Sequence, residues 1–193
     1  MKHIDKGNGT ALEPAKGEMV GIRKVAAFIK TVLPKKLKKD LLKLKMMKEA
    51  DLECRAYYHV SRFLLRQPEW KIFARKYSPA ERFIDLLLFK NKYPRIAIEL
   101  KWNQAGIAKK DRESLHLAIE KLGVQKAFFI TTLIGGKKYQ RITKKDSLEK
   151  GALFGIPVPL SLTGEKLKRW KEQRQVFMKK MQPSRKGKKS PAQ

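Results

Sequence analysis

The stretch RIAIELKW, residues 95–102, carries a glutamate and a lysine two residues apart inside an apolar run. Its aliphatic and β-branched residues predict a strand, in which successive side chains alternate between the two faces of a sheet. Glu99 and Lys101 therefore share one face with Ala97. The other face holds the apolar residues Ile96, Ile98, Leu100 and Trp102. The two charges either face solvent or line a site.

The segments around this strand predict an α/β fold. Alternating apolar residues and the turn KNKYP indicate an antiparallel meander over residues 70–102. A helix that ends at Gly123 and a buried strand that ends at GG follow it. The predicted elements are a long helix from the mid-40s to about residue 65, strands over residues 70–78, 81–89 and 95–102, a helix over residues 108–123, and a strand over residues 126–134. This order predicts a short mixed sheet flanked by helices.

Both ends of the chain are basic and differ from this core. Helical spacing from Gly21 to Leu33 is interrupted by Pro34, and GEKLKRWKEQRQVFMKKM predicts one more amphipathic helix. We expect that helix to turn inward Leu167, Trp170, Phe177 and Met181. The predicted organisation is a flexible N-terminus (1–18), a basic helical extension (19–45), a core (46–160), a basic amphipathic helix (161–181) and a disordered basic tail (182–193).

The charge of the chain predicts a polyanionic partner. Lysine and arginine number 46 against 18 acidic residues, a formal net charge of +28, which favours nucleic acid as the partner. The basic helices could lie along phosphates, or pack their leucines on the core and expose their lysines to water. The candidate nucleic-acid-binding residues are Lys35, Lys36, Lys38, Lys39, Lys137, Lys138, Lys168 and Arg169.

Other composition features narrow the class of protein. Cys54 is the single cysteine, which excludes an intramolecular disulfide and a thiolate zinc site. No run approaches the roughly 20 apolar residues that span a bilayer, and the N-terminus lacks the apolar segment of a secretory signal. We therefore expect a cytoplasmic protein without a membrane partner.

Three acids are candidates for a site around Glu99 and Lys101. Asp85 alternates with apolar neighbours in the preceding strand, where a carboxylate is costly unless it is paired or binds metal. One hairpin turn can bring it beside Glu99. Glu53 lies in the apolar stripe of the long helix, and Glu49, one turn earlier, is the reserve candidate. The expected stripe contains Met46, Glu49, Ala50, Ala56, Tyr57, Val60 and Phe63.

Converging carboxylates and a lysine suit phosphodiester hydrolysis. Carboxylate oxygens hold Mg²⁺, or Mn²⁺ as a substitute, and leave coordination positions for water and a phosphate oxygen. The ammonium group of Lys101 can stabilise charge beside the scissile phosphate or orient the attacking water. The sequence therefore predicts a metal site that includes Asp85 and Glu99.

This pattern resembles the PD-(D/E)xK nuclease superfamily, which includes restriction endonucleases and Holliday-junction resolvases. An aspartate is followed by Glu-x-Lys in a strand that ends a hairpin, with an acidic helix before it and a helix and a buried strand after it. The resemblance covers about residues 46–133 and implies a restriction-endonuclease-like core. Ile84 stands where the superfamily often has proline. The catalytic residues that the resemblance implies are Glu53, Asp85, Glu99 and Lys101.

The remaining polar candidates carry weaker signals. His59 and His116 have no histidine or cysteine partner at ligand spacing, so we expect them to be exposed or to face phosphate. Gln104 could reach substrate or simply lead into a helix, and GGKK at residues 135–138 lacks the full phosphate-loop signature. Trp102 is expected in the core, with base stacking as the alternative.

The sequence thus favours a Mg²⁺-dependent nuclease that acts on DNA rather than RNA, and it leaves open whether the chain acts as a monomer or as a homodimer. A catalytically inactive nucleic-acid-binding protein on the same fold is the alternative. A ribosome- or RNA-associated factor is a third hypothesis, which rests on the lysine-rich ends.

Overall fold

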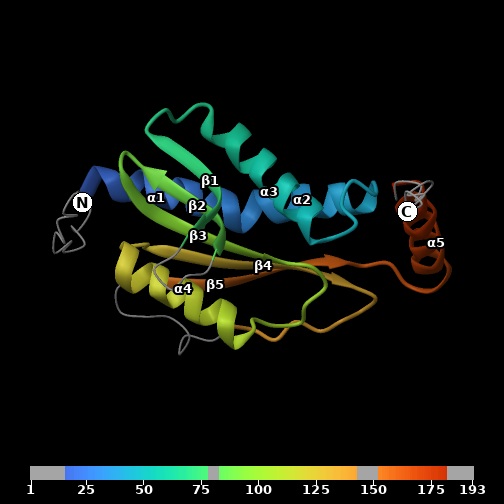
Figure 1. The fold of residues 1–193 in the computed structure, drawn as a ribbon. Coiled ribbons are helices and arrows are strands. Elements are labelled where there is room, and N and C mark those ends of the chain that lie inside the picture. The colour runs from blue at the N-terminus through green and yellow to red at the C-terminus, as the bar shows by residue number, and fades with distance from the viewer. Residues whose placement is uncertain (1–15, 78–82, 143–151, 182–193) are drawn as a thin grey trace, which may run out of the picture.

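The computed structural model describes residues 16–77, 83–142 and 152–181 (Figure 1). Its elements are the helices α1 (Lys16–Ala27), α2 (Leu33–Leu42), α3 (Glu49–Leu64), α4 (Lys109–Leu122) and α5 (Gly164–Met181), the π-helical turn η1 (Phe28–Val32), and the strands β1 (Trp70–Tyr77), β2 (Phe83–Lys90), β3 (Tyr93–Lys101), β4 (Lys126–Ile134) and β5 (Ala152–Leu160). Both chain ends of the predicted organisation, residues 1–15 and 182–193, lie outside the described residues.

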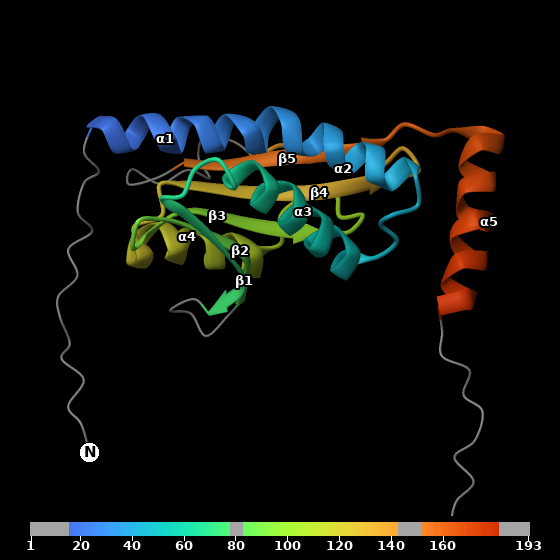
Figure 2. The same cartoon turned by 90° about the horizontal axis from the view of Figure 1, so that it is seen from above.

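A five-stranded mixed sheet in the order β1-β2-β3-β4-β5 forms the centre of the fold. The first three strands form the predicted antiparallel meander, and helix α4 links β3 to its parallel neighbour β4. Figure 2 shows α1 and α2 on one side of the sheet and α4 on the other. Two clusters of buried apolar side chains fill these layers, one beneath α1–α3 and one beneath α4. The predicted α/β class, with helices on both faces of the sheet, is therefore confirmed.

Strand β5 was not predicted from the sequence. Its segment, ALFGIPVPL, contains a glycine and two prolines, which are depleted in strands. Pro157 and Pro159 occupy alternate positions, so their missing N–H groups fall on the same side of the strand. Because β5 ends the strand order and pairs with β4, these positions suit its outer edge.

The helical region at the N-terminus continues through Pro34, contrary to the prediction of a break. The π-helical turn η1 ends just before Leu33, and the proline occupies the first turn of α2, where a missing N–H leaves no intrahelical bond unmade. The apolar side chains of this region are fully buried at Ile22, Val25, Ile29, Leu33, Leu37 and Leu41. The segment 19–45, predicted as an extension, thus contributes to the core.

Helix α5 stands apart from the sheet at one end of the molecule (Figure 2). Trp170 anchors it, because the ring is buried and its Nε1 donates a hydrogen bond to the carbonyl oxygen of Leu41 over 3.2 Å. Leu167 is half-buried. The prediction that Phe177 points inward is wrong, since 44% of this residue is exposed. The side chain of Met181 lies outside the described part of the structure.

Within the described ranges, no helix combines the length and the apolar composition that crossing a membrane requires.

Candidate active site

The β2–β3 hairpin brings Asp85 and Glu99 together. Leu86 pairs with Ile98 in the antiparallel ladder, and continuing this register by one residue places Asp85 opposite Glu99. The Oδ2 atom of Asp85 accepts a hydrogen bond from the backbone N–H of Leu100 over 2.8 Å. The spacing of the hairpin and the alternation along both strands therefore place the two carboxylates at one point of the sheet.

Lys101 lies among carboxylates from three elements. Its Nζ atom is 2.6 Å from Glu99 Oε1, 3.5 Å from Glu49 Oε1 and 3.9 Å from Asp111 Oδ1. Glu49 opens α3 and Asp111 lies in the first turn of α4, so helices from both faces of the sheet meet at the end of β3. The ammonium group is the centre of the cluster.

Burial shifts the protonation of both strand carboxylates. Burial, followed by the charge of Asp85, raises the pKa of Glu99 to about 7. Burial also raises the pKa of Asp85 to about 6, although the Leu100 N–H and Lys101 oppose the shift. Burial alone would lower the pKa of Lys101, but the attraction of Glu99, Asp85 and Asp111 raises it above its ordinary value. Lys101 is therefore a permanent cation beside carboxylates that titrate close to neutral pH.

Two oxygen atoms of this cluster have no hydrogen-bond partner within the part of the chain that the structure describes. They are Glu99 Oε2 and Asp111 Oδ2, both fully enclosed. Buried carboxylate oxygens are costly when they are left unpaired, and hard cations prefer such oxygens as ligands. Across the described residues, no three carboxylates, histidines or thiols stand in a ready metal-binding arrangement. The donor type fits a divalent cation, but the side chains would have to adjust around it.

The structure separates the two acids considered on α3. Glu53 forms an ion pair with Arg75 of β1, with 2.9 Å between the charged atoms, although its charge still contributes to the raised pKa of Asp85. Glu49, the reserve candidate, contacts Lys101 and accepts a hydrogen bond from the N–H of Trp102 over 3.3 Å. Of the two acids, Glu49 is thus the one in direct contact with the lysine.

The buried stripe of α3 also differs in phase from the predicted one. It consists of Leu52, Ala56, Val60 and Leu64. Tyr57 is 39% exposed and Ala50 is exposed, so the prediction is wrong at these two positions. Met46, which precedes the helix, is fully buried, as predicted. The expected stripe was centred on Glu53, which lies beside the buried face rather than within it, and this choice rotated the expected face.

Asp111 was missed in the sequence. It lies in the run AKKDRES, whose charges are typical of a solvated first turn of a helix, where an acid also interacts favourably with the helix dipole. In the structure this residue is only 6% exposed. Its one sequence signal is an acid in the first turn of the helix that follows the Glu-x-Lys strand.

The loop after β3 is held by local hydrogen bonds. Gln104 donates its side-chain amide to the carbonyl oxygen of Gly106 over 2.6 Å, a structural contact within the loop. Asn103 adopts a positive φ of 53°, and its carbonyl oxygen accepts a hydrogen bond from Lys137 Nζ over 3.0 Å. Lys137 therefore lies at the edge of the cluster. The partly buried ring of Trp102 lies 5.6 Å from the guanidinium carbon of Arg174 on α5.

The other basic candidates are spread over α2, the segment after β4, and α5. Exposed side chains are found at Lys35, Lys36, Lys39, Lys138, Lys168 and Arg169, whereas Lys38 is half-buried. Arg169 pairs with Glu165 one turn away. Among the described residues, the ion pairs of the carboxylate cluster involve Lys101 and none of these basic candidates.

His59 is not exposed, which was one of its two predicted alternatives, since only 10% of its side chain is accessible. Its Nε2 lies 2.7 Å from Oδ2 of the buried Asp40, which also accepts a hydrogen bond from Arg55 over 2.7 Å. Because a carboxylate can only accept, this ring nitrogen is the donor. His116 is half-buried on α4.

Comparison with known proteins assigns no family. No family model and no curated protein matches the chain. A solved structure with some similarity is the refined half-complex from a tetradecameric assembly of Thermococcus gammatolerans McrB AAA+ hexamers with bound McrC. The match has 11% sequence identity and a TM-score of 0.38, and it covers 67% of this chain and 33% of that chain. The chain thus spans about a third of the chain that it matches, at a similarity too low to indicate function.

Proposed function

We propose that this protein is a Mg²⁺-dependent nuclease with a restriction-endonuclease-like core, and that DNA is its favoured substrate. The observation that carries the proposal is the meeting of Asp85, Glu99 and Lys101 at one end of the β2–β3 hairpin. Buried acids in contact with a buried lysine are costly to a fold, so a functional role gives a physical reason for their presence.

The order of elements supports the nuclease core. Helix α3, the meander β1–β3, helix α4 and strand β4 follow one another in the order that the PD-(D/E)xK superfamily would require. The Glu-x-Lys motif ends β3, and the motif aspartate lies on the neighbouring strand.

Asp85 and Glu99 would hold the cation, with Asp111 as a further oxygen donor. The unpaired atoms Glu99 Oε2 and Asp111 Oδ2 are suitable ligands, and a bound Mg²⁺ would activate water and offset charge on the leaving oxygen. Lys101 keeps its ammonium charge and stabilises the negative charge of the scissile phosphate. Glu49 and Asp111 keep that ammonium group in position.

The basic surface would bind nucleic acid independently of its base sequence. Phosphate contacts from lysine and arginine fix the position of a nucleic acid without reading its bases. Lys137 contacts the loop after β3, and Arg174 lies near Trp102, so both cations are placed beside the end of the motif strand.

Cleavage of labelled substrates tests the proposal. Single-stranded, duplex and branched DNA, and RNA, would be incubated with the protein in Mg²⁺, Mn²⁺ or EDTA. Alanine at Asp85 or Glu99 should reduce cleavage by at least about 100-fold and leave binding nearly unchanged. Glu120→Gln is the matched control, because it removes one exposed carboxylate of α4 and should cleave like the wild type.

Cleavage by the Asp85 and Glu99 variants at the rate of the wild type, or cleavage in excess EDTA, would refute the proposed metal-dependent nuclease activity. Tight binding without cleavage in either metal, over all substrates, would instead favour the non-catalytic nucleic-acid-binding protein that the charge of +28 also fits.

A further inference from the structure

A second basic site lies in a groove between two helical walls, away from the carboxylate cluster. The groove encloses about 400 Å³ and contains none of the proposed catalytic residues. It is lined by Lys24, Phe28, Lys36, His59, Arg62, Phe63, Arg66 and Gln67. One wall is α1, η1 and α2, and the other is the second half of α3 with the residues just after it.

The charges of the groove are not balanced by acids. Four of its eight lining residues are lysine or arginine, and none is aspartate or glutamate. Lys24, Lys36 and Arg66 are exposed and make no ion pair with a carboxylate among the described residues. Like charges held close together repel one another, so a bound anion would stabilise this arrangement.

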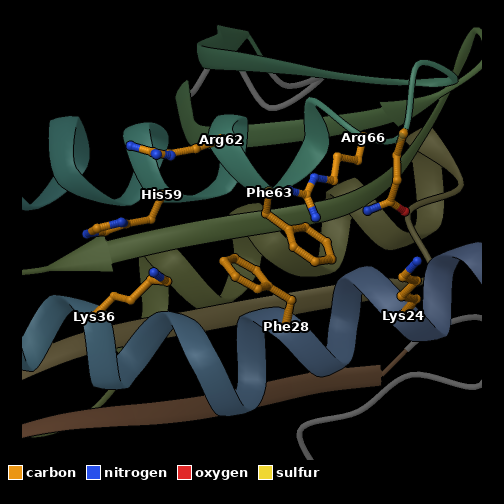
Figure 3. A pocket seen from close by; sticks show the side chains of 8 residues that line it. Lys24, Phe28, Lys36, His59, Arg62, Phe63 and Arg66 are labelled. Carbon is orange, nitrogen blue, oxygen red and sulfur yellow. The ribbon is translucent and has the colours of Figure 1, made fainter.

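The groove has charged ends and an apolar middle. Figure 3 shows Lys36 beside His59 at one end and Lys24 at the other, with the rings of Phe28 and Phe63 between them and the guanidinium group of Arg66 above the Phe63 ring. The two rings stack with 4.0 Å between their centroids and fix the distance between the walls. His59 is itself held in place by its hydrogen bond to Asp40.

We propose that this groove binds phosphate groups, and that these belong to a nucleic-acid strand running along it. His59 lies on α3 and Arg66 lies just beyond its end, so cationic and polar side chains follow one another along this wall of the groove. The phosphates of a nucleic-acid strand likewise repeat along its length, one at each nucleotide. Arginine binds phosphate through two parallel N–H groups, which suits Arg62 and Arg66.

The groove would extend the contact of the nucleic acid beyond the proposed catalytic centre. Glu49 and His59 lie on the same helix, about 15 Å apart along its axis. The choice of a nucleic-acid strand as the ligand agrees with the proposed function, but binding by the groove does not depend on cleavage.

Fluorescence anisotropy with labelled oligonucleotides, in EDTA to prevent cleavage, tests this site. The variant Lys24→Gln/Arg66→Gln removes two of the four lysine and arginine charges that line the groove. The control Lys92→Gln/Lys121→Gln removes two exposed charges from the β2–β3 turn and from α4. The groove variant should raise Kd at least about fivefold and lower the slope of log K against log salt by about 1.4 to 1.8, and the control should change both much less.

Equal effects of the two double variants would overturn the proposal, since binding would then depend only on total charge. A parallel titration with inorganic tripolyphosphate separates the two sources of phosphate. If the groove variant lost only tripolyphosphate binding and bound oligonucleotides as before, the groove would be assigned to a small phosphate compound. The proposal of a nucleic-acid strand would then be overturned. Melting curves check that both double variants remain folded. None of these outcomes depends on whether the protein cleaves nucleic acid.

Discussion

At the scale of single residues, Asp85 links the proposed site to the stability of the fold. Its pKa is about 6 in the folded chain against an ordinary value of 3.8. Between these values the folded chain binds a proton that the unfolded chain releases, so raising the pH favours unfolding. The stability contributed by this group is complete below about pH 4 and is lost as the pH rises through 6.

We therefore expect Asp85→Asn to stabilise the metal-free protein at pH 8 by about 2 to 3 kcal/mol, and to have little effect near pH 4. The asparagine oxygen can still accept the hydrogen bond from Leu100. Chemical denaturation in EDTA at several pH values measures the difference. A gain or loss that stays constant over this pH range would show that the effect does not come from the ionisation of Asp85.

The acids of α3 give a second prediction at this scale. Glu49 contacts Lys101 directly, whereas Glu53 is paired with Arg75. We expect Glu49→Gln to reduce cleavage about tenfold or more, and Glu53→Gln to reduce it by only a few-fold, because only Glu49 positions the ammonium group. Initial rates at saturating Mg²⁺ compare the two variants. A larger loss at Glu53 would instead restore the assignment that the resemblance implied.

The residues of the cluster differ in how far the sequence could predict them. The meeting of Asp85 and Glu99 follows from strand alternation and a short turn, both of which are local rules. Asp111 belongs to the same cluster only because α4 crosses back over the sheet, and a single charged helical turn carries no sign of that packing. Glu49 and Glu53 are one turn apart, so choosing between them requires the start and rotation of α3.

At the scale of elements, the predictions failed where the position of a proline or glycine is explained by tertiary structure rather than by local sequence. Pro34 was predicted to interrupt the helix. In the structure the π-helical turn before it is followed directly by α2, and the proline occupies the first turn of that helix. Pro157 and Pro159 belong to a residue type that is depleted in strands, and β5 was not predicted, although alternate prolines suit the outer edge of a sheet. Long apolar elements such as β4 and α4 were predicted within a residue or two, because their periodicity is set by burial.

Helix α5 provides the prediction for an element. Trp170→Ala removes the buried anchor of this helix and its hydrogen bond to Leu41, at a cost of about 3 to 5 kcal/mol if the helix stays docked. We expect the helix to undock instead, so that its backbone amides exchange hydrogen much faster while those of β3 and β4 remain protected. Phe177→Ala is the control on the same helix, because its ring is 44% exposed and should have little effect. Equal protection in both variants would show that other contacts hold α5.

At the scale of the whole molecule, the net charge of +28 acts on the fold and on its partner in opposite directions. Repulsion among the positive charges destabilises the compact state. Salt weakens this repulsion, because the screening length falls from about 10 Å at 0.1 M to about 3 Å at 1 M. The same salt competes with the cations for the phosphates of a nucleic acid. Stability should therefore rise with salt while binding becomes weaker.

We expect the melting temperature to increase by several degrees between about 0.1 M and 1 M NaCl, and the Kd for an oligonucleotide to increase by more than about 100-fold. Calorimetry and anisotropy on the same preparation measure the two trends. NaCl and KCl at equal ionic strength should give the same shifts, because screening does not depend on which cation is added. A melting temperature that falls with salt would mean that attractive ion pairs, such as Arg55–Asp40 and Arg75–Glu53, outweigh the repulsion among the lysines and arginines.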